Sequence, residues 1–285
     1  MNIKLSADFI IKNFRYPIEM VLLTGLLIPY MSVGQTIANE HDSLKTIKIN
    51  RDVVMQFRWI DPGTYYMGST DSEIGRDKDE GPGHEVKLSK GFYLGIFEVT
   101  QSQWQAVMGF NPSVFQQGGD PGNRPVESVS WNDCIRFIEK LDSMELGHFR
   151  LPTEVEWEYA CRAGSQSRFY WGDDLKQELV FSYAWCNSRS FATTHPVGRK
   201  LPNDWGLYDM SGNVWEWCSD WYDACQGYSV TDPPRPQSGT EKVFRGGSWY
   251  DFPVSLRSAN RHRHGTDGRY TSIGLRLVLE REVLK

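Results

Sequence analysis

Apolar and polar residues alternate in several short stretches of the chain, which is the pattern of half-buried strands. Residues 55–60 alternate in this way, and Asp61-Pro-Gly63 then turns the chain into the apolar stretch 64–67. This arrangement predicts a β-hairpin. Residues 86–88 and 92–99 are predicted to form further strands, whereas the charged, Gly- and Pro-rich stretch 71–83 predicts a loop.

Short helices are predicted where a Ser or Thr is followed three residues later by a side chain that can cap the same turn. Thr100 begins one helix through residue 108, and Thr153 begins another toward residue 162. Ser130 caps a third helix over 134–146, with apolar residues on one face. Beyond Gly164 the pattern changes to short strands and long loops, so we expect one mixed α+β domain over residues 51–285.

The N-terminus has the pattern of a secretory signal peptide over residues 1–34. Lys4, Lys12 and Arg15 precede an apolar stretch at 20–31, and small residues follow before Gln35. An uncleaved membrane anchor is the alternative, although the apolar stretch is short for a span. We therefore expect an exported protein, in the periplasm, at the cell surface or extracellular, with a polar linker at 35–50.

Composition narrows the class of protein. Eleven Trp, thirteen Tyr and fourteen Phe accompany 26 Gly, as in a loop-rich fold stabilised by aromatic packing. The net charge of −5 gives no general attraction to nucleic acid, so none is expected as a partner. The five cysteines lack Cys-x-x-Cys spacing, which argues against zinc, but Cys218 and Cys225 could form a disulfide bridge.

Four motifs occur in a fixed order along the chain. They are Arg150-Leu-Pro-Thr-Glu-Val-Glu-Trp157, Gly206-Leu-Tyr-Asp-Met-Ser-Gly-Asn-Val-Trp-Glu-Trp217, Arg245-Gly-Gly-Ser-Trp249 and Ile273-Gly-Leu-Arg276. Together they resemble the formylglycine-generating enzyme (sulfatase-modifying factor) family. The resemblance implies an elaborated C-type-lectin-like α+β fold with short mixed sheets, few helices and long ordered loops. It also implies that Arg257, Arg261 and Arg276 are structural and bind buried carboxylates.

The chain departs from the family at the two positions that carry the catalytic cysteines. The family oxidises a sulfatase cysteine to an aldehyde with a thiolate pair that holds copper(I), a soft ion that needs soft ligands. The positions that match the pair are Asp251 and Leu256. We therefore expect no catalytic residue of this kind and no copper. The alternatives are an oxidoreductase of the same family that uses other ligands, or a structural component of an envelope complex.

Calcium is the cofactor that the resemblance implies. Matched residue by residue, Asp209 and Glu216 would supply side-chain oxygens, and Gly212 and Val214 would supply backbone carbonyls. Hard oxygen ligands of this kind suit Ca²⁺. A second ion would involve Asn187. The alternative interpretation is an Asx-turn, in which the carboxylate accepts hydrogen bonds from backbone amides.

Chemically unrelated residues separate the fixed motif positions near the C-terminus. Every one of these residue types can arise from an asparagine codon by changing its two adenines, and the stretch resembles the variable region of retroelement-diversified proteins with the same fold. The alternative is a family member whose active-site loops have diverged. The hypothesis is an exported binding protein for a protein or glycan ligand. The candidate ligand-binding residues are Tyr250, Asp251, Phe252, Val254, Ser255, His262, His264, Gly265, Gly268, Tyr270, Thr271 and Ser272.

Overall fold

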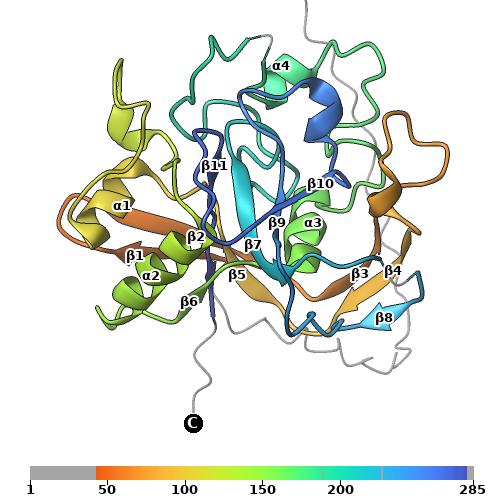
Figure 1. Cartoon of the computed structure of the whole chain (residues 1–285), viewed down its shortest axis with the longest axis horizontal. Coiled ribbons are helices and arrows are strands. Elements are labelled where there is room, and N and C mark those ends of the chain that lie inside the picture. The colour runs from red at the N-terminus through yellow and green to blue at the C-terminus, as the bar shows by residue number, and fades with distance from the viewer. Residues whose placement is uncertain (1–42, 188, 226, 281–285) are drawn as a thin grey trace, which may run out of the picture. The chain divides into compact units, whose positions relative to one another are not determined.

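The computed structural model describes residues 43–187, 189–225 and 227–280, which form three sheets with helices around them (Figure 1). The first sheet has the order β1-β2-β5-β12-β6 and is antiparallel throughout. Its strands are β1 Leu44–Lys48, β2 Val54–Ile60, β5 Phe92–Gly95, β6 Phe149–Arg150 and β12 Val278–Leu279.

The second and third sheets are mixed. In the second, of order β10-β9-β7-β11, only β11 runs parallel to its neighbour β7. In the third, of order β3-β4-β8, β4 and β8 are parallel. The strands are β7 Trp215–Trp221, β9 Lys242–Arg245, β10 Arg261–His264, β11 Ile273–Gly274, β3 Gly63–Met67, β4 His84–Leu88 and β8 Val230–Thr231.

Three helices begin at the capping boxes that the sequence predicts. Thr100, Ser130 and Thr153 each accept a hydrogen bond from the backbone N–H three residues on. The helices are α1 Gln101–Met108, α2 Trp131–Asp142 and α3 Glu154–Arg162, followed by the single turn α4 Val180–Tyr183 and the 3₁₀ turns Lys78–Glu80, Pro121–Asn123 and Pro253–Leu256.

Helix α2 ends four residues earlier than predicted, at Asp142. The Asp142 side chain accepts a hydrogen bond from the backbone N–H of Phe149, the first residue of β6. Glu145 has a φ of 57° and Gly147 a φ of 146°, so the chain reverses there to bring β6 beside β12. The apolar Leu146 packs on the core from this turn rather than from the helix.

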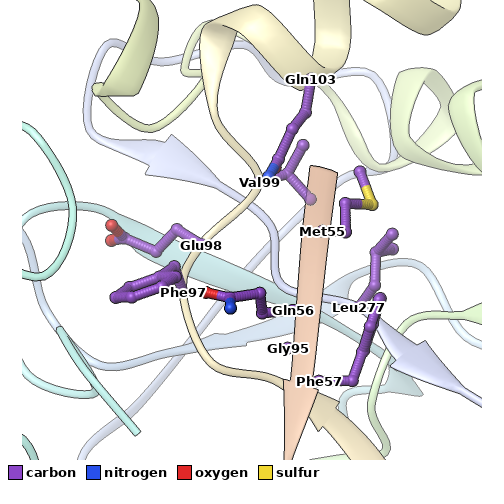
Figure 2. A pocket seen from close by; sticks show the side chains of 9 residues that line it. All are labelled: Met55, Gln56, Phe57, Gly95, Phe97, Glu98, Val99, Gln103 and Leu277. Atoms are coloured by element: carbon purple, nitrogen blue, oxygen red, sulfur yellow. The ribbon is translucent and has the colours of Figure 1, made fainter. Parts of the chain in front are cut away.

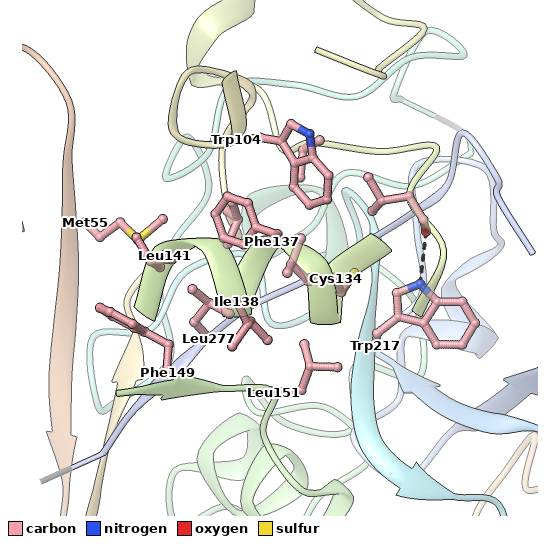
Figure 3. Close-up of a cluster of buried hydrophobic side chains, with 14 of the residues drawn as sticks. Met55, Trp104, Cys134, Phe137, Ile138, Leu141, Phe149, Leu151, Trp217 and Leu277 are labelled. Carbon is pink, nitrogen blue, oxygen red and sulfur yellow. Dashed lines mark hydrogen bonds between the residues drawn. The ribbon is translucent and has the colours of Figure 1, made fainter. Parts of the chain in front are cut away.

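The largest hydrophobic core lies between helices α1 and α2 and the first two sheets (Figure 3). Trp104 and Phe137 stack with their ring centroids 4.7 Å apart and join the two helices. Trp217 is fully buried, and its indole N–H donates to the carbonyl of Val129 at 3.1 Å. Aromatic packing of this kind stabilises a fold whose helices are short.

Two predictions about the N-terminal half of the domain are wrong. The stretches 55–60 and 64–67 are both strands, but they do not pair in a hairpin: β2 pairs with β1 and β5, whereas β3 pairs with β4. Strand β1 also lies within 35–50, the range expected to be a linker, so the folded domain begins earlier than residue 51. The expected signal peptide at 1–34 lies outside the described residues.

Two further findings concern cysteines and membrane spans. Cys218 and Cys225 are both free thiols, so the bridge that their spacing allowed does not form. None of the helices in the described part of the chain has the length and apolar character that a membrane span requires.

Candidate functional site

Buried arginines anchor the C-terminal segment to the rest of the domain. The Arg257 guanidinium binds the Glu80 carboxylate through two hydrogen bonds of 2.5 and 2.6 Å, and it also contacts Glu73. Arg261 binds Glu154 in the same two-pronged way, at 2.6 and 2.8 Å. Paired geometry of this kind is what makes a charge in the interior tolerable. The structural role that the family resemblance implies for these arginines is therefore what the structure shows.

The twelve candidate ligand residues all lie at least partly at the surface, between buried framework residues. Tyr250 and Phe252 are each 64% exposed, and Tyr270 is 43% exposed. The remaining candidates are exposed or half-buried. Most framework residues before and between them are fully or nearly fully buried, whereas the side chains of Arg263 and Arg269 are 44% and 51% exposed. The buried ones include Gly246, Gly247, Ser248, Arg257, Ser258 and Arg261.

Two tryptophans connect the two candidate segments, 250–255 and 262–272. Trp215 donates its indole N–H to Asp251 at 2.8 Å, and its ring meets the His262 ring edge-on at 5.2 Å. Trp249 donates to the carbonyl of Thr271 at 2.9 Å and packs edge-on against Tyr250. Both tryptophans are at least nine-tenths buried, so rigid side chains support the exposed residues from below.

The loop that carries the second segment is held in place at several points. The Arg269 guanidinium donates to the Asp133 carboxylate at 2.6 and 3.0 Å, next to the first turn of α2. The carbonyl of Tyr270 accepts a hydrogen bond from the backbone N–H of Ser128. The Tyr270 hydroxyl and the His264 ring lie 2.6 Å apart, so these two candidates contact each other directly.

Two exposed apolar residues beside this surface were not predicted from the sequence. Phe191 is 85% exposed and has a φ of 55°, a conformation that a bulky residue rarely adopts. Its neighbour Ser190 donates a hydrogen bond to the carbonyl of Trp249. Val114 is 62% exposed, and its neighbour Phe115 packs edge-on against the Trp249 ring. No signal in the sequence connects these distant segments to the C-terminal one.

The two positions that match the family's cysteine pair have unrelated environments. The Asp251 carboxylate accepts hydrogen bonds from the Ser248 hydroxyl at 2.5 Å and from Trp215. Leu256 is fully buried in a small apolar cluster that also contains Cys186. Neither side chain offers a soft ligand, so this arrangement cannot hold a cuprous ion by the family's chemistry.

Asp209 is the candidate calcium ligand with unused bonding capacity. It is 1% exposed; its Oδ2 accepts a hydrogen bond from the backbone N–H of Gly198 at 2.7 Å, and its Oδ1 has no partner. Burial raises the pKa of Asp209 to about 6. An unpartnered buried oxygen of this kind fits a hard cation.

Glu216 is already engaged. Arg276 donates to both of its oxygens, at 2.6 to 3.1 Å, and the Trp157 indole N–H donates to one of them at 2.7 Å. Glu216 would bind an ion directly only by giving up part of this ion pair. Gly212 and Val214 lie between the two carboxylates in the chain, and the backbone N–H of Val214 donates to Glu98.

Glu98 adds a third buried carboxylate to this group. It lines a cavity of about 20 Å³, and its carboxylate points away from Met55 and Leu277 (Figure 2). Burial raises the pKa of Glu98 well above its ordinary value, and repulsion from Asp209 and Glu216 adds to the effect. Arg276 is a buried cation beside these three carboxylates, so the carboxyl groups outnumber it.

Asn187 lies with the candidate ligand surface. Its side-chain amide donates to the carbonyl of Tyr250 at 2.9 Å, and its backbone N–H donates to the carbonyl of Asp251 at 3.0 Å. Its side-chain N–H is therefore used to position the segment that contains Tyr250 and Phe252. Among the described residues, no group of three or more His, Cys, Asp or Glu side chains is arranged to hold a metal ion.

Short mixed sheets, few helices and long loops held by buried ion pairs define the C-type-lectin-like α+β class. The family model of the sulfatase-modifying factor enzyme 1-like domain matches residues 46–281. The chain belongs to this family.

Relatives and solved structures agree with this assignment. Mouse formylglycine-generating enzyme is 33% identical over 283 residues, covering 78% of this chain and 74% of the relative. The structure of Treponema denticola variable protein 1 has a TM-score of 0.76 and 31% identity, covering 85% of this chain and all of that one. PvdO from Pseudomonas aeruginosa has a TM-score of 0.71 and 27% identity, covering 83% of this chain and 98% of that one. The similarity to both the enzyme family and a variable protein is thereby confirmed.

Proposed function

We propose that this protein is a ligand-binding member of the sulfatase-modifying factor family and that it does not generate formylglycine. The observation that carries the proposal is the division of the C-terminal segment into buried framework and exposed candidates. Side chains such as Tyr250 and Phe252 project from a backbone that Arg257 and Trp249 hold from below. Such positions can change without disturbing the core, and this freedom is what a diversified binding surface requires.

A protein ligand suits this surface better than a glycan. Tyr250, Phe252, Val254 and Phe191 expose between 42% and 85% of their surface, and exposed apolar groups that gather in one place mark protein interaction sites. Tyr and Phe provide a large contact area at a low cost in side-chain entropy, while His and Ser add hydrogen bonds. The candidate carboxylate, that of Asp251, already accepts hydrogen bonds from Ser248 and Trp215.

Binders selected from a random peptide library test the proposal. Peptides that bind the wild-type protein should bind the triple variant Tyr250→Ala, Phe252→Ala, Tyr270→Ala at least tenfold more weakly. They should bind the matched variant Leu175→Ala, Leu201→Ala with unchanged affinity, because those leucines are exposed elsewhere, at 64% and 51%. The triple variant should melt within a few degrees of the wild type, since exposed side chains contribute little to stability.

Equal binding to the wild type and the triple variant would contradict the proposal, and so would unfolding of that variant, which would place these residues in the core.

The enzymatic alternative is tested separately. Purified protein should contain no stoichiometric copper and should consume no oxygen with a sulfatase-derived thiol peptide; conversion of that peptide to an aldehyde would overturn the non-catalytic assignment.

We further propose that a calcium ion stabilises the domain, with Asp209 as its side-chain ligand and the carbonyls of Gly212 and Val214 beside it. The unpartnered Oδ1 of Asp209 and the excess of buried carboxylates support this proposal. Glu216 would then share its charge between the ion and Arg276.

Export, proposed from the pattern of residues 1–34, is tested by N-terminal sequencing of the mature protein, which should begin at Gln35.

A further inference from the structure

A second pocket, of about 120 Å³, lies at the end of β7, and the paired residues Arg261 and Glu154 form part of its lining. Asp220 and Trp221 come from β7, and Met67 comes from the end of β3. Residues of the segment that follows β8, including Pro233 and Pro234, form another wall. Proline restricts its own φ angle, which limits the conformations open to this wall.

Asp220 is a buried charged group inside this pocket, and it forms no ion pair with the described residues. It is 8% exposed, and its Oδ2 accepts hydrogen bonds from the backbone N–H of Glu154 at 3.0 Å and from the Ser219 hydroxyl at 3.1 Å. In the described part of the chain, no Lys, Arg or His nitrogen lies within 4.0 Å of its carboxylate. Burial, reinforced by repulsion from Glu154, raises the pKa of Asp220 to about 6.

The cations nearby bind other groups. Arg235, which stands between Pro234 and Pro236, donates to the Ser219 hydroxyl at 3.2 Å, and its charge lowers the pKa of Asp220 although no ion pair forms between them. Arg261 and Arg245 both donate to the Glu154 carboxylate. The Lys242 ammonium lies over the rings of Trp131 and Trp221, at 4.2 and 3.8 Å, and donates to the carbonyl of Ser219. A carboxylate that is nine-tenths buried and has no cation in direct contact is costly, and a cation from outside would lower that cost.

The rest of the pocket suits an aliphatic chain. Met67, Val155 and the three prolines at 233, 234 and 236 provide apolar wall around the carboxylate. Lysine and arginine side chains combine an apolar stem with a charged head, and each part finds a complement here.

We propose that this pocket binds an aliphatic side chain that ends in an ammonium or guanidinium group, as lysine and arginine do. The cationic head pairs with Asp220, and the stem lies along Met67 and the prolines. This site does not depend on the surface around Tyr250 and Phe252, so either proposal can fail without the other.

Small amides of single amino acids test the site. Nα-acetyl-lysine methylamide and the arginine analogue should bind the wild-type protein saturably, shifting the NMR signal of the Trp221 indole N–H. The norleucine analogue keeps the aliphatic stem but lacks the charge, and it should bind at least tenfold more weakly. Equal binding of norleucine and lysine, or no saturable shift with any probe, would overturn the proposal.

Two variants test which carboxylate of the pocket binds the cationic head of the lysine probe. Asp220→Asn keeps an oxygen for the backbone N–H of Glu154 but removes the carboxylate, so affinity for the lysine probe should fall at least tenfold. Asp223→Asn changes an exposed residue at the edge of the same pocket, and the affinity should change less than twofold. Unchanged affinity in Asp220→Asn would contradict the assignment.

A measurement on the wild-type protein keeps the test decisive if Asp220→Asn does not fold. Cys225 lines the pocket and is partly exposed, whereas Cys134, Cys161, Cys186 and Cys218 are fully buried. A saturating concentration of the lysine probe should slow the alkylation of Cys225 by iodoacetamide several-fold, and the norleucine probe should not. Equal alkylation rates with both probes would exclude a ligand in this pocket.

Discussion

At the scale of single residues, buried arginine side chains connect distant segments of this aromatic, loop-rich domain through ion pairs rather than disulfide bridges. Arg245, Arg257 and Arg276 are each 0% exposed, and each binds carboxylates from distant parts of the chain. Such a pair is neutral as a unit, but removal of one partner leaves an isolated charge in the interior. Replacing the arginine alone should therefore destabilise the domain by more than the net free energy that the intact ion pair contributes.

Arg257→Ala tests this asymmetry. It leaves Glu80, which is 1% exposed, without its cation, and the free energy of unfolding should fall by about 3–5 kcal/mol. Arg136→Ala is the matched control, because Arg136 pairs with Asp133 but is 54% exposed, and its loss should cost about 1 kcal/mol or less. Urea denaturation measures both variants. Similar losses in the two would show that the buried pair has no special role.

At the scale of elements, local signals predict where helices begin better than they predict which strands pair. The capping boxes at Thr100, Ser130 and Thr153 are local, and all three helices start there. Strand pairing is not local: β2 and β3 follow each other directly, yet they join different sheets. Strand β1 has no fully buried residue and its Ile47 packs on the core only in part, so this edge strand leaves little hydrophobic pattern to detect.

Asp133 connects two elements, because it caps α2 and also binds Arg269 in the candidate ligand loop. Burial alone would raise its pKa, but hydrogen bonds from Arg269 and Ser130 outweigh burial and lower the pKa to about 2. The unfolded chain therefore takes up this proton at a higher pH than the folded one. The stabilisation is complete above about pH 4 and is lost as the pH falls toward 2.

Asp133→Asn should therefore flatten the pH dependence of the urea midpoint between pH 4 and pH 2. Asp71→Asn serves as the control, because the Asp71 side chain is 97% exposed, and it should retain the wild-type slope. A wild-type slope in Asp133→Asn would mean that the carboxylate does not titrate with folding.

At the scale of the whole molecule, the sequence predicts the family, the α+β class and the surface position of the C-terminal candidates. The motifs contain the Trp, Gly and Arg residues that form the framework, and these residues can be recognised from the sequence alone. The position of Phe191 and Val114 near the same surface was not predictable, because only the folded chain brings their neighbours Ser190 and Phe115 into contact with Trp249. The pocket at Asp220 was missed for the same reason.

Removal of calcium should lower the stability of the domain as a whole. If the ion is present at about 100 times its dissociation constant, a chelator should lower the melting temperature by roughly 5–10 °C. Asp209→Asn should melt at the same temperature with and without chelator, and Asp204→Asn, an exposed change nearby, should respond as the wild type does. An unchanged wild-type melting temperature in chelator would exclude the site.

The position of β12 has a consequence for how such a protein can vary. This two-residue strand lies in the interior of the first sheet, paired with β5 on one side and β6 on the other, and it is made after every candidate ligand residue. A stop codon or frameshift within 250–272 would therefore delete the strand that joins two others, leaving both edges open. Truncated products of this kind would fail to fold, so folding of the domain requires synthesis of the chain through residue 279.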